Sequence, residues 1–222
     1  MEFLQSFFSL QVLRETAPLL GNGLLVTLKL IALVVPIGLL LGLGVALLYR
    51  SSTRRLQPLV EIYIDIFRAF PPLVLIILVF YGLPFLGIKL GETSAVVTAL
   101  CLAASGYYGE IFRAAIHSVS RGQWEAARAT GFGAAQTFVF IIFPQALRRA
   151  VPSLLGNTIE LSKGTALAAV VSTPELLRNA QIAQNLTYSP TPVVAAALIF
   201  YVIFAPLVRL ASSGAPKPTW RR

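Results

Sequence analysis

The chain has 222 residues, of which 56% are hydrophobic and only 12% are charged, and its mean hydropathy is +0.77. A soluble domain carries about 25% charged residues, so this composition favours a membrane protein over a soluble domain. The formal net charge of +9 does not indicate nucleic acid binding, because the basic residues lie in short loops between apolar segments, where such charges orient membrane helices.

Few side chains in the sequence are suited to covalent or metal chemistry. Cys101 is the only cysteine, which excludes an intrachain disulfide, and it lies within an apolar run that favours a buried, inert thiol. A lone histidine, His117, with no cluster of cysteines or carboxylates near it, argues against a metal site. No catalytic residue and no metal ligand is therefore predicted.

The N-terminal segment, residues 1–22, mixes apolar residues with Glu2, Arg14 and Glu15 and lacks the basic start of a cleaved signal peptide. We predict an amphipathic helix at the membrane interface there. A single membrane domain is expected over residues 23–211, and residues 212–222 form a basic tail that is expected to be cytoplasmic.

Five segments are long and apolar enough to cross a hydrocarbon layer about 30 Å thick, which takes about 20 helical residues. Backbone polar groups in lipid need partners within the same segment, so the expected fold class is an all-α membrane protein with five transmembrane helices. The expected spans are Leu24–Leu48, Leu59–Leu83, Ser94–Ile116, Val151–Val171 and Thr191–Leu210. Pro36, Pro71 and Pro72 are predicted to bend their helices, while Gly38 and Gly42 favour close approach of a second helix.

Loop charges predict the orientation of the chain. Lysine and arginine accumulate in cytoplasmic loops. One side of the membrane receives Arg50, Arg54, Arg55, Arg121, Arg128, Arg148, Arg149, Arg209, Lys217, Arg221 and Arg222, and the other only Arg14, Lys89 and Arg178. The N-terminus is therefore expected outside and the C-terminus in the cytoplasm, which makes the loop between the third and fourth spans cytoplasmic.

That loop contains a short polar segment, "QWEAARATG", residues 123–131. The composition predicts a helix over residues 123–130 with Glu125 and Arg128 one turn apart, ended by Gly131. Two turns of helix are too short to be stable alone in water, so either the rest of the loop or a partner must hold them. Helix physics leaves both interpretations open, as a solvated connection or as a docking element.

The spacing of this segment resembles a family motif. Glu125, Ala126 and Ala127 are followed after three residues by Gly131, and then by Ile141 and Phe143-Pro144. This is similar to the EAA motif of binding-protein-dependent ABC importer permeases, with Phe143 in place of the usual leucine. The segments "GYYGEIFRAAIHSVSRGQWEAARATGF", "FPQALRRAVPSLLGN", "FRAFPPL" and Gly23 with Thr27-Leu28 resemble the polar amino acid branch of these permeases, over about residues 20 to 211.

The resemblance implies a type I ABC importer transmembrane domain, located in the bacterial inner membrane and not itself an enzyme. Glu125, Ala126, Ala127 and Gly131 would belong to a coupling helix that docks on a separate ATPase subunit. No lysine of the chain follows the glycines of a P-loop, so ATP and Mg²⁺ are expected on the partner ATPases and no cofactor on this chain. Further expected partners are a second permease, identical or related, and an external binding protein that delivers a polar amino acid.

Two clusters of ionisable and polar residues lie inside the predicted spans. They are Glu61, Asp65 and Arg68 in the second span, and Asn157, Glu160 and Lys163 in the fourth. Such groups are costly in lipid, so each cluster either lines a solute path or pairs internally, as Asp65 with Arg68 and Glu160 with Lys163. The low hydrophobicity of the fourth span favours a path there, and the second span leaves both interpretations open.

The mixed charges of these clusters fit a zwitterionic amino acid as solute, and the three carboxylates Glu61, Asp65 and Glu160 favour a cationic one slightly. Two segments near the presumed path depart from the sequence usual in the polar amino acid permeases: Arg68-Ala69-Phe70-Pro71 and Lys163-Gly164-Thr165-Ala166. The identity of the solute is therefore left undetermined. Two other classes of function remain alternatives. One is a secondary transporter or channel driven by an ion gradient, and the other is a membrane scaffold that binds an ATPase without transport.

Overall fold

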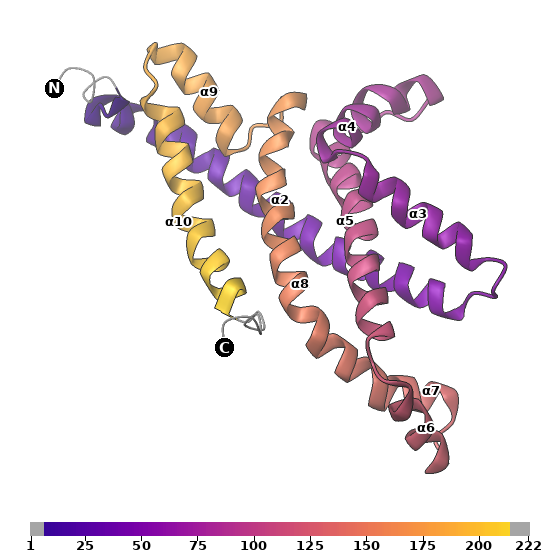
Figure 1. Cartoon of the computed structure of the whole chain (residues 1–222). Coiled ribbons are helices and arrows are strands. Elements are labelled where there is room, and N and C mark those ends of the chain that lie inside the picture. The colour runs from indigo at the N-terminus through magenta and orange to yellow at the C-terminus, as the bar shows by residue number, and fades with distance from the viewer. Residues whose placement is uncertain (1–6, 214–222) are drawn as a thin grey trace.

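The computed structural model describes residues 7–213, and within this range the chain is helical and contains no strand (Figure 1). The main helices are α2 (Leu10–Ser51), α3 (Gln57–Ala69), α4 (Pro72–Ile77), α5 (Glu92–His117), α6 (Arg121–Ala129), α8 (Phe143–Gly164), α9 (Leu176–Thr187) and α10 (Thr191–Ser213). Shorter turns are η1 (Leu78–Gly82), η2 (Leu83–Leu86), α7 (Ala134–Gln136), η3 (Thr137–Ile142) and η4 (Thr165–Val171).

Four helical segments in the described range are long and apolar enough to span a membrane: Leu10–Ser51, Glu92–His117, Ala134–Val171 and Thr191–Ala211. A fifth candidate span consists of Gln57–Ala69 and Pro72–Leu86, which meet at 98°. The prediction of an all-α membrane protein with five spans is confirmed in this form. The inside–outside orientation of the chain stays a prediction.

The second predicted span is a bent pair of helices. A proline disfavours helical geometry in the residue before it and lacks an N–H for the helix ladder. Accordingly Phe70 and Pro71, which precede Pro71 and Pro72, have extended ψ angles of 129° and 134°. The predicted bend at these prolines is confirmed. Pro36 lies inside α2, which continues to Ser51, and the bend predicted there stays a prediction.

Helix α2 begins well before the first predicted span. Its 42 residues run without a break from Leu10, so part of the predicted interfacial segment continues directly into the span. Residues 1–6 of that segment, and residues 214–222 of the predicted basic tail, lie outside the described residues. The proposed boundary at residue 23 therefore does not coincide with a break in the helix.

Helix α5 is the centre of the bundle. It packs against α2, α3 and α8, and it is the most buried of the candidate spans. Gly38 and Gly42 of α2 face it so closely that an added Cβ would lie 2.6 Å from the Ala104 Cβ and 2.4 Å from the Tyr108 Cβ, respectively. The predicted close approach at these glycines is confirmed, and α5 is the helix that uses it.

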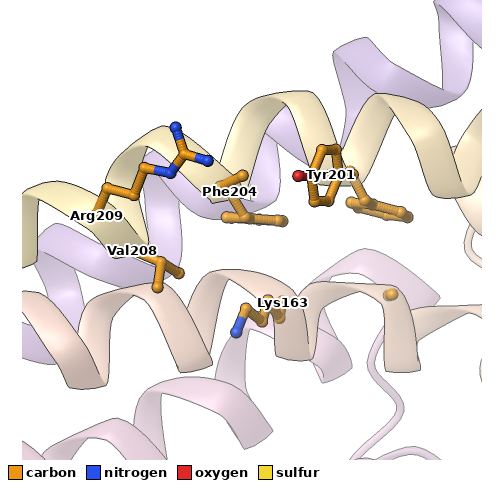
Figure 2. Close-up of a pocket in the computed structure, with 8 residues that line it drawn as sticks. Lys163, Tyr201, Phe204, Val208 and Arg209 are labelled. Atoms are coloured by element: carbon orange, nitrogen blue, oxygen red, sulfur yellow. The ribbon is translucent and has the colours of Figure 1, made fainter. Parts of the chain in front are cut away.

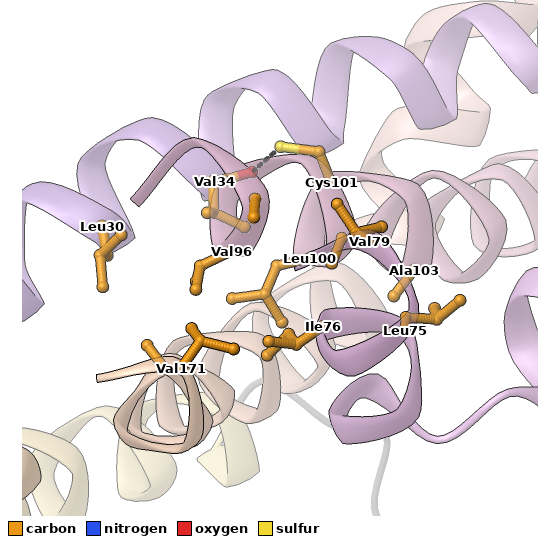
Figure 3. Close-up of a cluster of buried hydrophobic side chains, with 13 residues drawn as sticks. Leu30, Val34, Leu75, Ile76, Val79, Val96, Leu100, Cys101, Ala103 and Val171 are labelled. Carbon is orange, nitrogen blue, oxygen red and sulfur yellow. Dashed lines mark hydrogen bonds between the residues drawn. The ribbon is translucent and has the colours of Figure 1, made fainter. Parts of the chain in front are cut away.

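The main apolar core joins α2, α4, η1, α5 and η4 (Figure 3). It includes Leu30, Val34, Ile76, Val96, Leu100, Cys101 and Val171. Cys101 is buried there and its thiol lies 3.9 Å from the Val34 carbonyl, which agrees with a packing role. Away from this core many large apolar side chains are exposed, especially on α10, as expected of surfaces that meet lipid or another membrane subunit.

Helix α9 packs on the N-terminal half of α2, where Gly23 and Thr27 contact it. A Cβ at Gly23 would lie 2.9 Å from the Leu176 Cα, so only glycine allows this approach. The Thr27 hydroxyl accepts a hydrogen bond from the Leu176 N–H at 3.1 Å, and the Asn179 amide donates to the Leu19 carbonyl at 2.9 Å. These contacts hold α9 to α2 at the end of the molecule opposite α6 (Figure 1).

Candidate functional site

Helix α6 forms where the sequence predicts it and ends as predicted. Gly131 adopts φ 86°, a left-handed conformation that glycine reaches without steric cost. The Gly131 N–H donates to the Arg128 carbonyl at 3.0 Å and the Phe132 N–H donates to the Ala127 carbonyl at 3.1 Å. This pair of hydrogen bonds is a Schellman motif, which satisfies the last carbonyls of α6.

One side of α6 packs on its own chain and the other is open. Ala127 is buried, whereas the side chains of Glu125 and Ala126 are exposed. Within residues 7–213 neither Glu125 nor Arg128 takes part in an ion pair, although the two lie one turn apart on α6. The exposed side of α6 therefore offers an unpaired carboxylate beside a small residue.

One polar contact and one aromatic ring hold the packed side of α6. Trp124 is half-buried against the apolar cluster that contains Phe138 and Ile142 of η3. The Gln145 side-chain amide of α8 donates to the Gln123 side-chain oxygen at 3.0 Å. In Figure 1, α6 and α7 lie together beyond the ends of α5 and α8, away from α9. The nine-residue helix α6 is therefore held by η3 and the start of α8.

A cavity of about 500 Å³ lies between α5 and α8, next to Pro72 at the start of α4. Asn157, Glu160 and Lys163 all line it, so the three predicted residues of the fourth span share one side of α8 and one cavity. Tyr107 of α5 lines the same cavity and was missed by the sequence analysis. The signal available for it was a polar-tipped aromatic residue, in "GYYGE", inside an otherwise apolar span.

Glu160 and Lys163 form an ion pair at the mouth of this cavity. The Lys163 Nζ lies 2.7 Å from the Glu160 Oε1, and their side chains are 41% and 70% exposed, for Lys163 and Glu160 respectively. The predicted pairing thus exists, yet both side chains remain accessible from the cavity. An exposed pair contributes little to stability, so the pairing alone gives no strong structural reason for two charges in a span.

The cluster in the second span lies elsewhere. Glu61 accepts a hydrogen bond from the Tyr49 hydroxyl at 2.9 Å, which directs it towards α2. Asp65 and Arg68 are exposed and form no ion pair in the described part of the chain. Arg68 reaches the region of the cavity only through its carbonyl oxygen, which accepts from the Tyr107 hydroxyl at 3.1 Å. The structure therefore does not bring the two predicted clusters into one site.

A second cavity, of about 550 Å³, lies between α8 and α10. Figure 2 shows Tyr201, Phe204 and Val208 on α10, which runs alongside the α8 segment that carries Lys163. Lys163 lines both cavities, so it stands between a mixed polar cavity and a mainly apolar one.

Comparison with known proteins decides the family. The family described as "Binding-protein-dependent transport system inner membrane component" matches residues 35–216. The chain belongs to this family of transport permeases. The permease is accordingly a multi-pass protein of the bacterial inner membrane and is not itself an enzyme.

Individual relatives agree along most of the permease. The probable glutamine ABC transporter permease protein GlnP of Bacillus subtilis (strain 168) is 36% identical over an alignment of 197 positions, which covers 86% of this chain and 90% of that protein. The arginine transport system permease protein ArtQ of the same organism is 33% identical over 84% of this chain and 86% of its own length.

A solved structure shows the same fold. The crystal structure of an amino acid ABC transporter with histidines contains a chain that is 35% identical to the permease, with a TM-score of 0.84. The match covers 92% of this chain and 96% of that chain. The predicted resemblance to ABC importer permeases is therefore confirmed along nearly the whole described range.

Proposed function

We propose that this permease is the transmembrane subunit of an ATP-driven importer for a polar amino acid, supplied by an external binding protein. The observation that carries the proposal is the exposed side of α6, where Glu125 and Ala126 remain open although the helix is anchored through Ala127 and Trp124. The relatives named for glutamine and arginine, and the amino acid transporter crystallised with histidines, support this class of solute.

In this function α6 is the coupling helix. The small side chain of Ala126 allows a groove on an ATPase subunit to approach the helix, and the unpaired Glu125 carboxylate is suited to a basic residue of that groove. ATP and Mg²⁺ are bound and used by the partner ATPases, and this chain binds neither. The chain continues from α6 through η3 into α8, and α8 lines the cavity that contains Lys163. A movement of α6 can therefore be transmitted to this cavity through η3 and α8.

The cavity between α5 and α8 is the proposed solute path. Glu160 is suited to an ammonium or guanidinium group, Lys163 to a carboxylate, and Asn157 and Tyr107 to hydrogen bonds with either. Glu160 is 70% exposed in the single permease, so a second copy or a related permease facing α8 would enclose the path. This mixed-sign set, with one carboxylate and one ammonium, fits a zwitterionic amino acid. Glu61, Asp65 and Arg68 lie outside this cavity, and we assign them no contact with the solute in this arrangement.

The test is reconstitution of the permease with its ATPase and binding protein in vesicles, with uptake and ATP hydrolysis measured together. Glu125→Lys should weaken docking on the ATPase and lower the amount of amino acid taken up per ATP. Thr53→Lys, which adds a charge to the exposed α2–α3 loop, is the control and should leave the ratio unchanged. An unaltered ratio in Glu125→Lys, or uptake that survives ATP depletion and stops with an uncoupler, would contradict the proposal.

A further inference from the structure

Arg50 lies at the C-terminal end of α2, where it contacts two aromatic rings from other elements. Its guanidinium carbon lies 3.7 Å from the centre of the Phe138 ring in η3 and 5.5 Å from the centre of the Trp124 ring in α6. Both distances fall within the range in which a cation is attracted to the face of a ring. A single side chain therefore joins α2, α6 and η3.

The η3 segment is the weak point in the backbone between α6 and α8. Residues Thr137–Ile142 form a π-helix, a wide turn that is rare and occurs frequently at functional sites. The hydroxyl of Thr137 is buried and has no hydrogen-bond partner among residues 7–213, which is costly for a buried polar group. A segment with these two features is suited to a change of shape, so it can absorb a displacement of α6.

The other polar contacts near α6 lead to α8. The Gln123 side chain accepts from Gln145 at 3.0 Å, and the Arg149 guanidinium donates to the Ser118 carbonyl between α5 and α6. Arg50 adds a contact with α2. Helix α2 in turn packs on α5 through Gly38, whose added Cβ would lie 2.6 Å from the Cβ of Ala104 in the wall of the solute cavity.

We propose that Arg50 is a positioning residue for transport: it fixes α6 and η3 to the end of α2, so that a displacement of α6 reaches the α2–α5 pair. Without the contacts of Arg50, the displacement of α6 is absorbed by a change of shape in η3. ATP hydrolysis by the partner then continues, but the wall of the solute cavity moves less. The proposal rests on the coupling role proposed for α6, and it assigns a task to a residue that lies outside the EAA segment.

The contact itself can be tested on the permease alone, independently of transport. The chain has two tryptophans, so Trp220→Phe leaves Trp124 as the single reporter for labelling with 5-fluorotryptophan. Arg50→Gln should shift the ¹⁹F resonance of Trp124, because it removes a cation near the ring. The neighbouring exposed cation Arg55, changed to Gln, is the matched control and should leave the resonance in place. An identical resonance in Arg50→Gln and the parent overturns the proposal.

The consequence for transport is tested in the reconstituted importer. Loss of the cation–π contacts should lower uptake per ATP about three- to tenfold in Arg50→Gln. Phe138→Leu should do the same, because it keeps an apolar side chain and removes the ring face. Arg50→Lys should restore part of the ratio, since an ammonium is still attracted to the rings but lacks the planar stacking of a guanidinium. Arg55→Gln should match the parent.

The outcomes separate this inference from the proposed function. If Glu125→Lys lowers uptake per ATP and Arg50→Gln does not, the role of Arg50 is refuted and the coupling role of α6 stands. If neither variant lowers it, both proposals fail. Membrane level and assembly with the ATPase are measured for every variant. If Arg50→Gln does not accumulate in the membrane, Arg50→Lys and Phe138→Leu are compared instead. The inference is overturned if both of these variants take up as much amino acid per ATP as the parent.

Discussion

Gly42 of α2 lies directly against Tyr108 of α5, at a separation that leaves no room for a side chain at position 42. An added Cβ would come within 2.4 Å of the Tyr108 Cβ and 2.9 Å of the Gly109 nitrogen. Tyr108 is fully buried, and its hydroxyl shares a hydrogen bond of 2.8 Å with Thr158 of α8. One tyrosine thus links α2, α5 and α8, of which α5 and α8 line the proposed solute cavity.

Gly42→Ala should therefore destabilise the permease by about 1–3 kcal/mol, because overpacking forces α2 and α5 apart. Gly44→Ala is a matched control two residues along the same helix, since its added Cβ meets nothing within 4 Å. That control should be neutral or gain up to about 1 kcal/mol from the replacement of a helical glycine. Thermal unfolding of the two purified variants measures the difference, and equal midpoints would refute the contact.

Gly131→Ala should loosen the end of α6. An L-residue in the left-handed conformation costs about 1–2 kcal/mol, so the amides of Gly131 and Phe132 should exchange with solvent about ten times faster. Gly122→Ala serves as the control, because Gly122 lies within α6, has a negative φ and has open space around it. Hydrogen exchange of the intact permease provides the measurement, and protection that is the same in both variants would contradict the role of Gly131.

An exchange of charges distinguishes the two interpretations of Glu160 and Lys163. The double variant Glu160→Lys with Lys163→Glu keeps an oppositely charged pair one helical turn apart, but reverses the two positions in the cavity. If each side chain contacts the solute, the double variant should transport as poorly as either single variant, with a raised KM. Recovery of transport to the parent level would show that Glu160 and Lys163 only neutralise each other and do not contact the solute.

Stability should depend on the ionisation of Glu175. This fully buried carboxylate accepts hydrogen bonds from the Leu177 and Arg178 N–H groups, at 2.9 and 2.7 Å. Burial raises the pKa of Glu175, although these backbone hydrogen bonds oppose the rise. A raised pKa means that the folded state favours the protonated acid, so the contribution of Glu175 is greatest at low pH and declines as pH rises through the folded-state pKa.

The thermal midpoint of the parent, measured relative to Glu175→Gln, should accordingly increase when the pH is lowered from neutral towards the ordinary pKa of glutamate. The amide of the variant does not titrate, so the difference between the two proteins isolates this group. A difference that is constant with pH, or that falls on acidification, would show that Glu175 is not responsible.

Some of this architecture is local and could be predicted from the residues. Apolar stretches about 20 residues long make membrane helices, because lipid offers no partner for a free backbone group. The bend at Pro71–Pro72 and the end of α6 at Gly131 follow from backbone chemistry at those positions. Asn157, Glu160 and Lys163 share a cavity because residues three apart on a helix lie on one side of it.

Other features depended on which helices meet in the tertiary structure. The residues alone left open whether Glu61 lines a solute path, and in the structure Glu61 accepts a hydrogen bond from Tyr49 of α2 and does not line the cavity that contains Lys163. Tyr107 joins the cavity because α5 places it opposite α8, and Arg50 meets Trp124 and Phe138 because the end of α2 lies beside α6 and η3.

The amino-acid sequence alone thus determined which segments cross the membrane, where α6 ends and which residues of α8 share a side, since these depend on neighbours within a few residues. It did not predict α9 or the early start of α2. Only the tertiary structure decided which sides face each other. That choice depends on how closely glycines such as Gly38 and Gly42 let helices approach, and on the rotation of each helix about its axis.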